Sequence, residues 1–144
     1  PNNGGYNDGF VARLSGDLRA EPPVTPSEPC VPSATKLCLN GGRFHVTVRW
    51  RDYAGTRGDG QAVTETDDAG LFWFFDAANL EMLVKVLDGC ALNDRYWVFA
   101  AAATDVEYEL TVRDAVTGQS RTWHSPLGVA SPAITDTGAL AVCP

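Results

Sequence analysis

The chain has 144 residues, of which 44% are hydrophobic and 20% charged, and its net charge is −7. This length and composition indicate one globular domain rather than a disordered chain. The acidic balance argues against a nucleic-acid partner, because phosphate binding needs a basic surface. No hydrophobic run approaches the roughly 20 residues that span a bilayer, so we expect no membrane insertion.

The first predicted element is a short strand at residues 10–15, FVARLS, within an N-terminal arm at 1–21. Phe10, Ala12 and Leu14 alternate onto one of its faces. Hydrophobic residues also occur on the other face, and such a strand is not stable alone in water. It must therefore dock on a surface. The residues that we assign to the docking interface are Phe10, Val11, Ala12, Arg13 and Leu14.

A proline-rich linker follows at residues 22–32, where five of the nine prolines lie. Such a run favours extended polyproline geometry, so this stretch reaches roughly 35 Å, about one domain diameter. Three fates of the preceding strand stay open: docking on an edge of its own sheet, permanent disorder, or donation to a neighbouring copy. Donation would combine main-chain hydrogen bonds with side chains in pockets, and repeated donation builds an open helical homopolymer.

The four cysteines of this small acidic chain indicate two disulfides and therefore a secreted, extracellular protein. They are Cys30, Cys38, Cys90 and Cys143. A zinc site is not favoured, because no two of them have the Cys-x-x-Cys spacing. Three pairings are open. We favour Cys30–Cys38, a local loop, together with Cys90–Cys143, which would tie the chain end to the middle of the domain.

Residues 33–144 form the main domain and read as a series of short strands separated by turns. We expect residues 71–75, LFWFF, to be buried on both faces, and Trp50 and Trp73 to lie in the core. Residues 54–60 read as a glycine-rich turn. The spacing indicates an all-β, antiparallel β-sandwich or jelly-roll-like domain. Strands are expected at 43–53, 61–66, 71–75, 82–89, 95–103, 106–114, 120–125 and 139–143.

Several bulky motifs occur along this domain in a fixed order: CLNGGRF at 38–44, FWFF at 72–75, VKVLDG at 84–89 and WVF at 97–99. Over about residues 30–128, they resemble a β-sandwich module of secreted bacterial proteins. The resemblance implies a sandwich fold and a bacterial source, and it implies no particular activity. More distantly, a free-standing module with a tethered strand resembles subunits of extracellular bacterial fibrils that polymerise by strand exchange.

Candidate catalytic residues are few, and we expect no enzyme. A Ser-His-Asp hydrolase needs a poised histidine, but His45 lies on the polar face of a strand and His124 closes another. Paired carboxylates for glycoside hydrolysis could come only from turn residues or from solvent-facing strand positions. The carboxylates in question are Asp67, Asp68, Glu107 and Glu109.

Two binding chemistries stay open. The turns RGDGQ, TDDAG and LDG supply oxygen atoms that could ligate calcium, although turn formation explains the same residues. We therefore assign no residue to a metal site. Apart from calcium, we expect no cofactor. Exposed aromatic side chains could stack on glycans, and Trp123 and Tyr53, near strand ends, are the best candidates for a sugar platform.

The sequence therefore predicts a structural subunit of an extracellular bacterial filament whose partners are copies of itself. It would polymerise by donating the N-terminal strand to the next copy. The alternative is a secreted carbohydrate-binding or adhesion module that uses exposed aromatic side chains.

Overall fold

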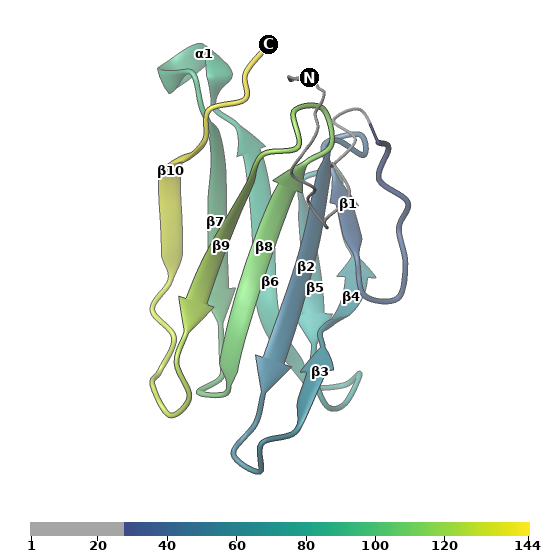
Figure 1. Ribbon diagram of the computed structural model, residues 1–144, viewed down its shortest axis with the longest axis vertical. Helices are drawn as coiled ribbons and strands as arrows, with labels where there is room; N and C mark the ends of the chain where they lie inside the picture. Colours follow the sequence, from purple (N-terminus) through teal and green to yellow (C-terminus); the bar gives the residue numbers. More distant parts are fainter. Residues whose placement is uncertain (1–27) are drawn as a thin grey trace, which may run out of the picture.

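The computed structural model describes residues 28–144 and folds them into ten β-strands and one short helix (Figure 1). The predicted docking strand and most of the proline-rich linker lie outside the described residues. The elements are β1 (Leu37–Leu39), β2 (Phe44–Arg51), β3 (Arg57–Asp59), β4 (Gln61–Thr64), β5 (Ala69–Trp73), β6 (Leu80–Asp88), α1 (Cys90–Asn93), β7 (Tyr96–Ala102), β8 (Glu107–Asp114), β9 (Ser120–Ser125) and β10 (Ile134–Leu140).

The strands form two antiparallel sheets that pack face to face, which confirms the predicted all-β sandwich (Figure 1). In the first sheet the strand order is β1-β2-β8-β9, and the short β3 pairs with the end of β2 that β1 does not reach. In the second sheet the order is β10-β7-β6-β5-β4. The chain passes between the two sheets three times, from β3 to β4, from β7 to β8 and from β9 to β10.

The core lies between the sheets and follows from the alternation of the strands. In β2, Phe44, Val46 and Val48 are at most 1% exposed, whereas the residues between them face outward. The register places Val46 opposite Val112 and Val48 opposite Leu110 of β8, so two strands present one apolar surface to the second sheet. That surface packs on the inward residues of the other sheet, which include Phe72, Met82, Val84, Val86 and Val98.

Both disulfides form with the pairing that we favoured. Cys30–Cys38 has a Cα–Cα distance of 5.7 Å and closes a short loop at β1. Cys90–Cys143 has a Cα–Cα distance of 5.8 Å and ties α1 to the end of the chain. Two disulfides are typical of proteins that fold in an oxidising compartment.

A buried ion pair fixes one end of the sandwich. Nε of Arg43 donates to Oδ1 of Asp114 at 2.8 Å, and the Asp114 side chain is 0% exposed. The same guanidinium donates to the carbonyl oxygen of Val142 and lies over the ring of Tyr96. Burial alone would raise the pKa of Asp114, but hydrogen bonds from Arg43, from Thr117 and from backbone amides together lower it. Arg43 thereby joins the start of β2, the end of β8 and the chain terminus.

The two sides of the sandwich are closed differently. On one side, the amide of Ala62 in β4 donates to the carbonyl oxygen of Ala34, just before β1, at 2.7 Å. On the other side, the edge strands β9 and β10 are linked by side chains: Arg121 pairs with Asp136 at 3.2 Å and donates to the carbonyl oxygen of Ala139. The core is therefore covered by the chain's own strands along both sides.

Three sequence-based expectations are wrong. LFWFF is not buried on both faces: Phe72 and Phe74 point inward, but Trp73 lies on the outer side of its sheet and Phe75 is 49% exposed. A two-layer sandwich leaves each sheet with one face that no other layer covers. Trp50 does pack against the core, stacked on Phe74 at 6.2 Å between centroids.

The other two errors concern sheet edges. Residues 57–59 form the short edge strand β3 rather than part of a turn. The last strand is Ile134–Leu140, not 139–143. Its first part, ITDTG, is polar because this edge strand pairs along only one side, with β7, and so needs no hydrophobic face of its own. The chain end beyond it is held by the disulfide to Cys90 instead of by a strand.

Candidate functional site

The two outer faces of the sandwich differ in chemistry. The outer face of β2, β8 and β9 carries charged and hydroxyl side chains, and we call it the charged face. The register aligns Arg49 with Glu109 and His124, and Arg51 with Glu107, across this sheet. The outer face of β5, β6 and β7 carries mainly hydrophobic side chains, and we call it the apolar face.

Glu107 is the centre of an ion network on the charged face. Its Oε1 accepts a hydrogen bond from Nε of Arg51 at 2.9 Å, and its Oε2 lies 2.9 Å from Nε2 of His124. The hydrogen bond with His124, and then that with Arg51, lowers the pKa of the Glu107 carboxyl. Because Arg51 and His124 occupy both carboxylate oxygens, Glu107 serves as a structural link between β2 and β9.

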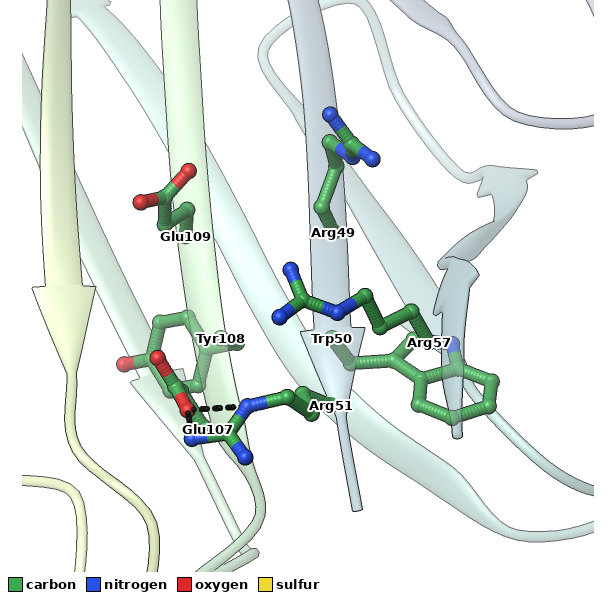
Figure 2. Close-up of a pocket in the computed structure, with 7 residues that line it drawn as sticks. All are labelled: Arg49, Trp50, Arg51, Arg57, Glu107, Tyr108 and Glu109. Carbon is green, nitrogen blue, oxygen red and sulfur yellow. Dashed lines mark hydrogen bonds and ion pairs between the residues drawn. The ribbon is translucent and has the colours of Figure 1, made fainter. Parts of the chain in front are cut away.

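Figure 2 shows the shallow hollow around this network, with the guanidinium groups of Arg49, Arg51 and Arg57 and the carboxylates of Glu107 and Glu109 at its rim. Arg49 also lies 3.9 Å from Asp59, and both side chains are largely exposed. Charges of both signs alternate here, so the hollow has no strong preference for an anion or a cation.

The candidate catalytic residues are not assembled into one site. His45 lies opposite Arg113, whereas His124 lies opposite Glu109, so the two histidines occupy different levels of the sheet. Burial, followed by the charge of Lys36, lowers the pKa of His45. Asp67 sits in the β4–β5 turn, where Oδ1 accepts the amide of Gly41 at 2.9 Å.

Asp68 follows Asp67 in the same exposed turn, away from Glu107 and Glu109 on β8. Within residues 28–144, no group of three or more His, Cys, Asp and Glu side chains is gathered as a metal site would require.

The two residues of the predicted sugar platform have different surroundings. Tyr53, in the β2–β3 turn, is 64% exposed, and its hydroxyl donates to Asp105 at 2.8 Å. Trp123 lies opposite Leu110 in β9 and packs partly buried against the core, with the guanidinium of Arg121 above its ring at 5.5 Å. Tyr53 is thus available to a ligand, whereas much of Trp123 serves packing.

The apolar face is the feature that sequence reasoning misjudged. One row across the sheet joins Leu71, Leu83 and Ala101, and the next joins Lys85 and Phe99. Leu83 is 39% exposed, although it lies in the central part of the sheet. The signal was in the sequence, since 82–87 and 96–101 are hydrophobic at both odd and even positions, but burial on both faces was expected only for 71–75, and no exposed face was expected.

Two adjoining hollows mark the apolar face. The first is lined by the start of β6 and the end of β7, with Leu80, Leu83 and Ala103 among its walls. The second lies between β6, β7 and the start of β10 and includes Lys85, Phe99 and Ile134. Leu83 and Ala101 line both hollows and so form the ridge between them.

Charged groups at these hollows are few. In the second hollow the ammonium group of Lys85 lies over the ring of Phe99, 5.8 Å from its centroid. In the first hollow the Glu81 residue is only 6% exposed, and its carboxylate accepts a hydrogen bond from Asn79 at 3.0 Å. Burial raises the pKa of Glu81. Lys85, which is half-buried, is therefore the cation beside which an acidic group on a docked partner would be stabilised.

The attachment of the N-terminal arm to the domain also bears on function. Cys30 is bonded to Cys38, which lies opposite His45 on the outer side of the first sheet. The N-terminal arm is consequently anchored at the edge of the charged face, on the opposite layer of the sandwich from the apolar face. The predicted docking residues 10–14 themselves lie outside the described part of the chain.

Comparison of the chain with protein-family models, with curated proteins and with solved structures found no match. Among the residues that the structure describes, no helix has the length and hydrophobicity needed to cross a membrane.

Proposed function

We propose that this chain is a structural subunit of an extracellular bacterial filament that assembles when residues 10–14 of one copy dock on the next copy. The observation that carries the proposal is the contrast between the two outer faces of the sandwich. One face is charged and well solvated, whereas the other exposes a continuous hydrophobic surface that includes Leu80 (46% exposed) and Leu83 (39% exposed). Large exposed hydrophobic patches mark interaction sites in soluble proteins.

The N-terminal segment has the hydrophobic side chains that such a surface needs. Burial of Phe10 and Leu14 would contribute roughly 1.5–3 kcal/mol each. Their sum, about 3–6 kcal/mol, corresponds to a dissociation constant between about 6 mM and about 40 μM before any ordering cost is subtracted. We therefore expect assembly to be reversible and to depend strongly on concentration, unless further contacts join neighbouring subunits.

An extracellular location is part of the proposal. Both disulfides close within the described domain, and such bridges persist outside the reducing cytosol. The net charge of −7 suits a solvated surface and discourages binding to nucleic acid.

The test compares the full chain with Phe10→Asp and Leu14→Asp by sedimentation velocity and negative-stain microscopy over a range of concentrations. Val24→Asp, which places the same change in the linker, is the control. We expect filaments or large oligomers from the full chain and from Val24→Asp, and monomers from the two variants. Monomeric full chain at every concentration would contradict the proposed function, as would unaltered assembly of both variants.

A sugar-binding function is the second candidate, and the observation in its favour is the exposed ring of Tyr53. A glycan that stacks on Tyr53 would change its fluorescence and would bind the monomer as well as any oligomer. A glycan array probed with the full chain and with Tyr53→Ala separates this candidate from assembly, because the assembly variants above would leave glycan binding intact.

A further inference from the structure

We infer that the receptor for the N-terminal segment is the apolar face, with Phe10 and Leu14 of one copy seated in the two hollows of its neighbour. This inference rests on the proposed function and names the surface that it requires. Three observations lead to it: the combined length of the hollows, the position of Lys85, and the layer of the sandwich on which the arm is anchored.

The combined length of the two hollows matches the reach of the segment. Along β7 and the residue that follows it, the lining of the two hollows together runs from Phe99 to Ala103, which are four residues apart. Phe10 and Leu14 are also four residues apart, and four residues of extended chain cover about 13 Å. The small side chain of Ala12 falls between them, where Leu83 and Ala101 form the ridge that separates the hollows. A large residue, a small residue and a large residue thus meet a hollow, a ridge and a hollow.

The charges agree with one direction of docking. Asp8 precedes Phe10 by two residues, so an extended continuation of the segment would place Asp8 on the same face as Phe10, Ala12 and Leu14. The second hollow contains Lys85 beside Phe99. With Phe10 in the second hollow and Leu14 in the first, the carboxylate of Asp8 comes within reach of the Lys85 ammonium group. The opposite direction would place Asp8 near the carboxylate of Glu81 instead.

The anchoring point of the arm favours docking on a neighbour over docking on the same copy. Cys30 holds the arm to β1, at the outer side of the first sheet, whereas the hollows are on the outer side of the second sheet. Beyond the anchor at Cys30, the proline content of residues 22–29 predicts a stiff spacer of roughly 25 Å. Such a spacer leads away from its own domain more readily than it folds back around a two-layer sandwich. The anchor of the arm and the receptor surface are on different layers, so the contact is heterologous, and it builds an open filament unless the rotation between copies closes a ring.

A symmetric contact between two apolar faces is less favourable for a physical reason. It would bury Lys85 of both copies in a hydrophobic interface, and this face offers no exposed carboxylate to pair with either. An unpaired ammonium group is costly to bury. The acidic residues that flank the N-terminal segment, Asp8 and Asp17, supply the missing partner.

The experiment places one charge on the proposed receptor surface of the full chain. Leu83→Asp alters the ridge between the hollows, and Leu92→Asp makes the same change at a residue of α1 that is 77% exposed and lines neither hollow. We expect Leu83→Asp to raise the concentration needed for assembly at least tenfold, and Leu92→Asp to leave it unchanged. Thermal unfolding checks that both variants remain folded.

A charge exchange provides a second readout that does not depend on the stability of Leu83→Asp. Lys85→Glu and Asp8→Lys should each weaken assembly about two- to fivefold, as expected for an exposed ion pair, and the double variant should recover most of the loss. Normal assembly of Leu83→Asp, or no recovery in the double variant, would overturn the inference. If Phe10→Asp still abolished assembly in that case, the proposed function would survive with a different receptor surface. If the unaltered chain did not assemble at all, both would fail.

Discussion

The buried pair of Arg43 and Asp114 allows the most quantitative prediction about the fold. Asp114 is fully buried and accepts hydrogen bonds from Arg43, from two backbone amides and from the hydroxyl of Thr117. Asp114→Ala removes all of these and leaves the guanidinium of Arg43, whose side chain is only 18% exposed, without its counter-ion. Removal of one partner from a buried ion pair costs about 3–5 kcal/mol.

This loss is a large fraction of the free energy of unfolding of a small domain, about 5–15 kcal/mol. With an m-value of about 2 kcal/mol per molar urea, the midpoint of urea unfolding should fall by about 1.5–2.5 M. Asp68→Ala is the matched control, because Asp68 is exposed and its side chain accepts no hydrogen bond within the described residues. We expect the control to change stability by less than about 0.5 kcal/mol.

The pH dependence of this stabilisation has a definite sign. The pKa of Asp114 is lower in the folded protein than in the unfolded chain. The contribution of Asp114 to stability is therefore fully present above its pKa in the unfolded chain, about 4, and is lost as the pH falls through its pKa in the folded protein. Urea unfolding of the unaltered protein and of Asp114→Ala, measured between pH 7 and pH 2, should show that the two stabilities converge as the pH falls. A constant difference across this range, or a loss below about 1 kcal/mol at pH 7, would refute the reasoning.

Three further predictions concern other parts of the domain. Burial raises the pKa of Glu81, so its deprotonation opposes folding as the pH rises through the pKa in the folded protein. Glu81→Gln should therefore stabilise the domain at pH 8, and much less at pH 4, when stability is measured by urea unfolding. Gly70→Ala should lower stability by about 1–3 kcal/mol, because its new methyl group would lie 2.5 Å from a methyl carbon of Leu37. Loss of Cys90–Cys143, with a separation of 53 residues, should cost about 1.7 kcal/mol more than loss of Cys30–Cys38, with a separation of 8.

Each of these has its own check. Glu109→Gln, at an exposed position, is the control for Glu81→Gln and should show no such pH dependence. An equal effect of the two variants would show that burial of Glu81 is not the cause. Gly138→Ala is the control for Gly70→Ala, because the nearest atom to its new methyl group is 3.8 Å away. For the disulfides, equal losses from the two double alanine variants would show that loop length does not decide their contribution.

The sequence was informative wherever one face of a strand meets the core and the other meets water. In β2, the alternation of Phe44, Val46 and Val48 with polar residues predicted both the strand and its orientation, and the structure agrees. Three disulfide pairings were open from the sequence, and the favoured one, with a short local loop and a long closing loop, is confirmed. These predictions depend on local periodicity and chain geometry, which a sequence displays directly.

The sequence was least informative about the apolar face and the sheet edges. Leu83 and Phe99 belong to strands that are hydrophobic on both faces, and periodicity cannot distinguish a covered outer face from an exposed one. The edge strands β3 and β10 are short or polar because they pair on one side only, so their hydrophobic signal is weak. The receptor surface became visible only when the register placed Leu71, Leu83 and Ala101 in one row on the outside of a two-layer sandwich.

A cross-linking experiment between two different chains tests the central claim most directly. One full chain carries Ala12→Cys, and a second, which also carries a mass tag, carries Ala101→Cys. The chains are mixed and oxidised gently, and the products are separated on a non-reducing gel. A chain with Leu92→Cys in place of Ala101→Cys is the control. The account predicts a mixed, disulfide-linked dimer that forms much faster with Ala101→Cys than with Leu92→Cys. Equal yields from the two would contradict docking of the N-terminal segment on the apolar face of a neighbouring copy.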